Sequence, residues 1–276
     1  MASSPPNVRL SLAATAENVV LVREMLSGVA DGIGLTAAHL NDIQTAVTEA
    51  CNNVVLHAYE DRPGPLDVAL CLLEHAIAVE VRDRGVGIES RENAEDDGIG
   101  LHVIRTLART VEVDRPYGGG SRVLMEFEAP EATPLELDRE DLEARTLKLA
   151  ESLSLTTVSI APIALAGTVL PRLVSALAAR AHFSTDRISD VQLLADTLVA
   201  HARTAMHGDR LDVDVEVEPR ALELHVAPIV PGRGRGIVSE SEFDGLGRII
   251  EKLTSSRRVR TADGYERLTL QMTDRR

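Results

Sequence analysis

Two side chains in the segment AVTEACNNVVLHAY are the first in this chain able to move a proton or bind a metal ion. Glu49 and Asn53 are four residues apart, so they lie on one face of a helix. The apolar stripe of that helix includes Ile43, Val47 and Val54, and the Glu49–Asn53 face lies about 110° from it. We expect the pair at the rim of the core, partly dry and open to a ligand. Taken alone, the pair is also compatible with a solvated helix face.

A second motif follows a predicted strand. Asp83 ends that strand and begins the segment DRGVGI, which contains Gly85 and Gly87. Glycines permit positive φ angles and let the backbone approach a planar ligand closely. A carboxylate beside such a loop can accept a hydrogen bond from an exocyclic amine, although many ordinary turns contain the same pattern.

Two glycine turns complete the set. Gly98 and Gly100 precede a predicted helix, and helix N-termini bind phosphate through their free backbone N–H groups. Ser121 follows three glycines at the start of a closing strand, where its hydroxyl can touch a phosphate. Each motif is common by itself, whereas this order on these elements is specific.

The elements that position these residues run in one order through residues 7–128. Alternating apolar residues predict strands, and apolar residues at helical spacing predict helices. The expected elements are a strand at 7–14, a helix through Val19–Val29, a helix at Ala37–Ala58, a hairpin at 66–83, a helix through Leu101–Val111 and a strand at 121–128.

The same order recurs about 150 residues later, which indicates an internal repeat. The second copy keeps the apolar pattern, but Thr197 and His201 stand where the first has Glu49 and Asn53, and its segment VAPIVPGRGRGI contains no acid. We predict an α+β fold, a two-layer α/β sandwich with a mostly antiparallel sheet and helices on one face. Its domains are 7–128 and 153–273, joined by an acidic linker at 129–152.

Composition narrows the class of protein. The hydrophobic fraction of 44% suits two globular cores, and the net charge of −14 disfavours direct nucleic-acid binding. Cys51 and Cys71 show no metal-ligand spacing and fit a reducing compartment. No basic-then-apolar signal or membrane-length apolar run is apparent. We therefore expect a soluble, cytoplasmic protein.

The ordered motifs resemble those of the Bergerat-fold ATPases, the GHKL superfamily. Within it, AVTEACNNVVLHAY is similar to the motif of the anti-sigma-factor serine kinases of the RsbW and SpoIIAB type. The resemblance covers residues 7–128 and reaches the second copy only as fold. It implies ATP and Mg²⁺ as cofactors and a protein serine kinase activity.

The resemblance also implies a role for each residue. Glu49 is implied as the general base, Asn53 as the Mg²⁺ ligand and Asp83 as the partner of the adenine amino group. His57 is implied to be structural. The remaining implied nucleotide contacts are Gly85, Gly87, Gly98, Gly100 and Ser121.

Partners follow from the same resemblance: a sigma factor that is sequestered and a STAS-type anti-anti-sigma protein phosphorylated on serine. Only nine residues, Glu89 to Asp97, separate GVGI from Gly98, so nucleotide binding is a firmer expectation than turnover. The alternatives are a non-catalytic, nucleotide-gated regulator and a detached histidine-kinase ATPase domain. The second copy is expected to replace the second protomer of a homodimer, or to be a decayed domain.

Overall fold

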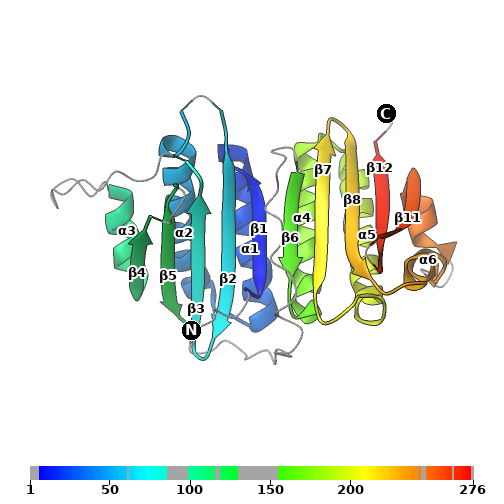
Figure 1. The fold of residues 1–276 in the computed structure, drawn as a ribbon, viewed down its shortest axis with the longest axis horizontal. Coiled ribbons are helices and arrows are strands. Elements are labelled where there is room, and N and C mark those ends of the chain that lie inside the picture. Colours follow the sequence, from blue (N-terminus) through cyan, green and yellow to red (C-terminus); the bar gives the residue numbers. More distant parts are fainter. Residues whose placement is uncertain are drawn as a thin grey trace.

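A computed structural model of the chain describes residues 6–60, 62–85, 99–115, 119–129, 155–240, 242–243, 247–262 and 264–274. It has two layers, a long sheet and a row of helices that covers one face of it (Figure 1). The expected α+β class is therefore confirmed. The predicted linker, apart from Ala129, and Gly87 and Gly98 lie outside the described residues.

The N-terminal half contains five strands and three helices in its described part. Two of its helices, α1 and α2, match the predicted helices closely. The elements are β1 (Val8–Ala13), α1 (Ala16–Ile33), α2 (Ala37–His57), β2 (Pro65–Leu73), β3 (Ala76–Asp83), α3 (Ile99–Leu107), β4 (Thr110–Asp114) and β5 (Arg122–Glu128).

The C-terminal half begins with the same succession and adds short elements near its end. A 3-10 turn, Ile163–Leu165, precedes its first helix. The elements are β6 (Leu155–Ile160), α4 (Ala166–Arg180), α5 (Thr185–Ala205), β7 (Leu211–Glu218), β8 (Ala221–Ile229), α6 (Arg233–Ser239), β9 (Glu242–Phe243), β10 (Gly247–Arg248), α7 (Ile249–Leu253), β11 (Ser256–Ala262) and β12 (Tyr265–Thr273).

The ten long strands form one continuous sheet in the order β11-β12-β8-β7-β6-β1-β2-β3-β5-β4. Each pairing described within it is antiparallel, and the order is symmetrical about the central β6–β1 pair. Leu10 pairs with Val68 and Val158 with Val213, and Leu10 and Val158 also pair with each other. Matching positions of the two halves therefore meet at the centre of the sheet.

The core lies between the sheet and the helices, as the apolar patterns predict. Helix α2 buries Ile43, Val47 and Val54, whereas Glu49 and Asn53 are half-buried beside that stripe. Their predicted place at the rim of the core is confirmed. On the other face of the sheet, the Ser11 hydroxyl donates to the Asp67 carboxylate across β1 and β2.

One predicted helix boundary is wrong. The apolar spacing through Val111 predicts a helix to that residue, but α3 ends at Leu107 and Val111 lies in edge strand β4. Valines alternate with polar residues in TVEVD, and cross-strand pairing with β5 decides the strand conformation there. Edge strand β11 and helix α6 were not predicted either.

The described residues include one segment, Ile163–Arg180, with the length and hydropathy of a membrane-crossing helix. It is 56% buried inside the protein, where α4 packs against α1 and α5. A core helix of a soluble protein passes the same test, so the segment is weak evidence for a membrane span.

Helices α1 and α4 meet where the two halves of the chain join (Figure 1). Gly28 of α1 permits this close approach, because a Cβ there would lie 2.6 Å from the Thr168 carbonyl oxygen and 2.7 Å from Val169 Cα. Arg172 of α4 also forms ion pairs with Asp31 and Glu24 of α1. The halves therefore share a packed helix interface as well as a strand pair.

Replacing Gly28 by alanine is expected to lower the free energy of unfolding by about 1–3 kcal/mol, because the added methyl group meets backbone rather than a movable side chain. Alanine at the matched helical position Gly167, where a Cβ has only an ordinary 3.8 Å contact with Val199, should be neutral or slightly stabilising. Urea denaturation measures both. Equal stabilities for the two variants would contradict the close packing.

Candidate functional site

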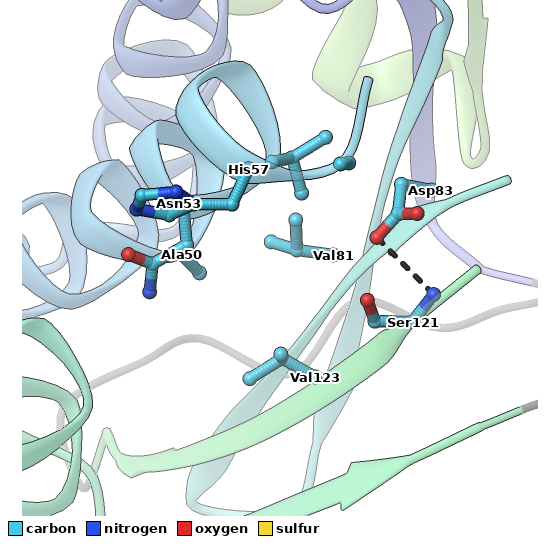
Figure 2. Close-up of a pocket in the computed structure, with 9 residues that line it drawn as sticks. Ala50, Asn53, His57, Val81, Asp83, Ser121 and Val123 are labelled. Atoms are coloured by element: carbon cyan, nitrogen blue, oxygen red, sulfur yellow. Dashed lines mark hydrogen bonds between the residues drawn. The ribbon is translucent and has the colours of Figure 1, made fainter. Parts of the chain in front are cut away.

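A pocket opens in the N-terminal half between the end of α2 and the strands β3 and β5. Asp83 and Ser121 lie on one side and Asn53 and His57 on the other, with Val81 and Val123 between them (Figure 2). The lining residues are Ala50, Asn53, Val54, His57, Ala58, Val81, Asp83, Ser121 and Val123.

Asp83 is the buried charge of this pocket, with 2% of its surface exposed. Its Oδ1 accepts a hydrogen bond from the Gly85 backbone N–H at 2.7 Å, and its Oδ2 accepts one from the Ser121 N–H at 3.2 Å. No ion pair to Asp83 exists within the described part of the chain. Two backbone dipoles thus hold the carboxylate in place, and each oxygen keeps a lone pair that a ligand donor can use.

Close backbone approaches around Asp83 require two of the glycines. A Cβ at Gly85 would lie 1.9 Å from the carbonyl oxygen of Ala58, the residue that follows α2. A Cβ at Gly120, whose φ is +84°, would lie 2.1 Å from the Asp83 carbonyl oxygen. The Gly120 N–H also donates to the Gly85 carbonyl at 3.0 Å. The strand ends that carry Asp83 and Ser121 are therefore fastened to each other.

Glu49 and Asn53 face the start of α3. A Cβ at Gly100 would lie 3.2 Å from Glu49 Oε2 and 3.4 Å from Asn53 Oδ1, so glycine leaves both oxygens uncovered. Asn53 lines the pocket, and Glu49 lies one helical turn away from it. The first turn of α3 therefore lies over the polar edge of α2.

Tyr59 braces this region and was not singled out from the sequence. Its hydroxyl donates to the Pro65 carbonyl at 2.6 Å and accepts from the Arg84 N–H at 2.9 Å, next to Asp83. Burial raises the pKa of Tyr59, so it stays protonated as the donor. In the sequence, the only indication of a role for Tyr59 is its place at the end of the HAY segment. His57, at the start of that segment, lines the pocket and is exposed.

Most of the expected site residues lie close together. Asn53, Asp83 and Ser121 line one pocket, and Gly85 and Gly100 adjoin it through the contacts above. The apolar walls formed by Val81 and Val123 were missed, because their strand pattern is that of ordinary core residues.

The corresponding region of the C-terminal half is built differently. The Thr197 hydroxyl donates to the Leu193 carbonyl, and His201 Nδ1 lies 2.8 Å from the Thr197 carbonyl oxygen, so both side chains bond to their own helix. In the N-terminal half, Asp83 of β3 lies opposite Leu66 of β2. In the C-terminal half, extending the β7–β8 pairing by one residue places Pro228 opposite Leu211, so Pro228 stands at the position that corresponds to Asp83. Ile237 of α6 is buried in the core.

Residues 12–127 match the protein family described as "Histidine kinase-like ATPase domain". The match runs from the end of β1 into β5 and contains all residues that line the pocket. A histidine kinase-like ATPase domain of the GHKL superfamily therefore makes up the N-terminal half of the chain.

Curated relatives narrow the likeness to one branch. An anti-sigma F factor of Clostridium acetobutylicum is 26% identical over 129 residues, covering 43% of this chain and 90% of that protein. A serine-protein kinase RsbW of Bacillus thuringiensis is 28% identical over 133 residues, covering 43% of this chain and 82% of that protein. The N-terminal half is thus RsbW-like. A solved structure, crystal form IV of TP0453, aligns at 9% identity with a TM-score of 0.35, too low to bear on the fold.

Proposed function

We propose that the N-terminal half binds Mg²⁺ and ATP and phosphorylates a serine of a STAS-type anti-anti-sigma protein, and that the protein sequesters a sigma factor in the cytoplasm. The observation that carries the proposal is the buried Asp83 carboxylate, held by two backbone N–H groups with free acceptor capacity toward the pocket. The likeness to RsbW and to anti-sigma F factor supports the choice of partners.

The pocket residues fit the adenine of ATP. Asp83 offers an acceptor for the exocyclic amino group, and Val81 and Val123 offer apolar surfaces for a flat ring. The lining combines apolar side chains with a few polar groups, which is the composition typical of small-molecule pockets. The pocket therefore supports recognition of a purine by a single carboxylate between apolar walls.

Asn53 and Glu49 fit the phosphate end of the same ligand. Asn53 supplies an amide oxygen of the kind that Mg²⁺ accepts alongside phosphate oxygens, and Mg²⁺, when bound, neutralises phosphate charge. Among the described residues there is no cluster of three or more His, Cys, Asp or Glu side chains that could hold a metal ion. Glu49 is next to Asn53 on α2, where its carboxylate can accept the proton of an incoming serine hydroxyl.

The C-terminal half, in this proposal, takes the place of a second protomer. The symmetrical strand order, the β1–β6 pair and the α1–α4 packing support such an internal pseudo-dimer, with domains at 7–128 and 153–273. Instead of the site residues, this half has Pro228, Thr197 and His201, which supports the proposal that it binds Mg-ATP weakly or not at all.

Calorimetric titration with ATP in the presence of Mg²⁺ tests both points. We expect saturation at one nucleotide per chain and a marked loss of affinity when Mg²⁺ is removed, because only the first half has the pocket. Light scattering of the same sample should give the mass of one chain. Two nucleotides per chain, or a tight homodimer that pairs the N-terminal halves, would contradict the pseudo-dimer.

Transfer is tested separately with labelled ATP and a candidate STAS protein. Label on a serine of that protein supports the kinase. Tight ATP binding without transfer to any candidate partner would favour the non-catalytic regulator instead.

A further inference from the structure

The outer edge of the sheet in the C-terminal half has an unbalanced positive charge. Strand β11, with the sequence SRRVRTA, is the last strand of the sheet and pairs only with β12 among the described residues. All of its residues except Val259 are exposed. Its outward-facing backbone N–H and C=O groups are therefore available to another strand.

Three arginines lie on the helix-free face of this edge. Arg260 is directly opposite Arg267 of β12, and Arg258 is opposite Thr269. Residues directly opposite in a sheet lie on the same side of it, and Leu268 and Leu270, which alternate with Arg267 and Thr269, point into the core. Arg258, Arg260 and Arg267 are therefore neighbours on one surface, which we call the arginine edge.

The arginine edge lacks internal counter-ions. Within the described ranges, none of its three side chains forms an ion pair or a hydrogen bond. Like charges placed directly opposite on neighbouring strands disfavour the sheet. Elsewhere on this face, Asp214 accepts from Thr157, Asp212 accepts from Ser159 and Arg210, and Glu216 and Glu223 lie beside His225.

The opposite edge of the sheet shows what is missing. There Asp114 of β4 lies directly across from Arg122 of β5. The corresponding pair in the C-terminal half is Arg260 of β11 and Arg267 of β12. Arg122 forms ion pairs with Asp114 at 2.8 Å and with Glu80 at 2.7 Å. An arginine has therefore replaced the carboxylate that neutralises this position in the N-terminal half.

We propose that the arginine edge is a docking site for an acidic segment of a partner protein, which adds to β11 as a further strand. Its carboxylates, two residues apart, would meet Arg258 and Arg260 and supply the charge that Asp114 supplies at the other edge. A strand of this chain's own β11 would be repelled by the same arginines. A long polyanion such as a nucleic acid is disfavoured by the net charge of −14.

Fluorescence anisotropy with a labelled peptide Thr-Val-Glu-Val-Asp-Val tests the proposal, with Thr-Val-Gln-Val-Asn-Val as the neutral control peptide. We expect the acidic peptide to bind and the double variant Arg258→Gln/Arg260→Gln to weaken binding at least tenfold. The matched variant Arg23→Gln/Arg109→Gln changes the net charge equally at two exposed positions of the N-terminal half, away from β11, and should bind as the unmodified protein does.

A stability measurement separates docking from folding. Arg260→Asp restores the charge pattern of the opposite edge, so its melting temperature should equal or exceed that of the unmodified protein while peptide binding is lost. ATP titration should be unchanged in all these variants, so this result is independent of the proposed kinase.

The proposal would be overturned by no binding of the acidic peptide, equal binding of the neutral peptide, undiminished binding by the double variant, or a lowered melting temperature of Arg260→Asp. Tighter binding of a DNA duplex than of the peptide would assign the edge to nucleic acid. Self-association lost in the double variant would assign it to a second copy of the chain. Either result would also overturn the proposal.

Discussion

Replacing Asp83 by asparagine is expected to weaken ATP binding by about 100-fold, equivalent to ~2.7 kcal/mol. The carboxylate has two acceptor oxygens, each already bonded to one backbone N–H group. An amide has only one acceptor oxygen, so its NH₂ group must face either a backbone N–H or the amino group of the purine. Calorimetry with ATP and Mg²⁺ measures the loss.

The same substitution should also destabilise the fold, by about 1–3 kcal/mol, because a buried backbone donor loses its acceptor. The urea midpoint therefore has to be measured with the affinity, and binding compared at a temperature where both proteins are folded. Unchanged ATP affinity in a folded Asp83→Asn protein would show that the purine does not bind at this carboxylate.

Asp67→Asn is the matched control, since Asp67 is also a buried aspartate and lies on β2, on the face of the sheet away from the pocket. Burial raises the pKa of Asp67 in the folded protein above its value in the unfolded chain. The free energy of unfolding therefore falls as the pH rises from the unfolded-state pKa to the folded-state pKa, and the ionised carboxylate destabilises the fold at neutral pH. Asparagine at neutral pH should therefore leave the fold no less stable and ATP affinity unchanged.

The polar centre of the site was predictable from the sequence because its geometry is local. Four-residue spacing places Glu49 and Asn53 on one face of α2 whatever packs around it, and strand alternation places Asp83 at the end of β3. Tyr59 was missed because its partners, the Pro65 carbonyl and the Arg84 N–H, are backbone groups that only the fold brings to it.

The edges of the sheet were not predictable in the same way. Strand β11 has a single valine among polar residues and so shows little apolar alternation, and its pairing with β12 decides its conformation. Helix α6 contains Gly234 and Gly236, which suggest a loop. In the fold, the Gly234 N–H donates to the Glu266 carboxylate of β12, a contact from a distant strand that the sequence pattern does not reveal.

Apolar and charged residues differ in how far they agree between matching positions of the two halves. Apolar positions that pack the sheet against its helices are kept in both halves, such as Leu10 and Val158 at the centre. The charged positions differ: Asp83 has Pro228 in its place, and Asp114 has Arg260. The N-terminal half has the pocket that contains Asp83, and the C-terminal half presents the arginine edge.

Glu49→Gln is expected to reduce phosphoryl transfer to a STAS protein by about 10²–10⁴-fold while ATP affinity stays within about threefold, because glutamine keeps the shape and cannot accept the hydroxyl proton. Asp42→Asn is the matched control: it makes the same charge change seven residues earlier on α2, on the same side of the helix, and should transfer phosphate normally. Rates are measured with labelled ATP under single-turnover conditions, so that binding and chemistry are separated. Full transfer by the Glu49→Gln protein would show that another group takes the proton. A parallel loss of ATP binding would instead place Glu49 among the residues that hold the nucleotide.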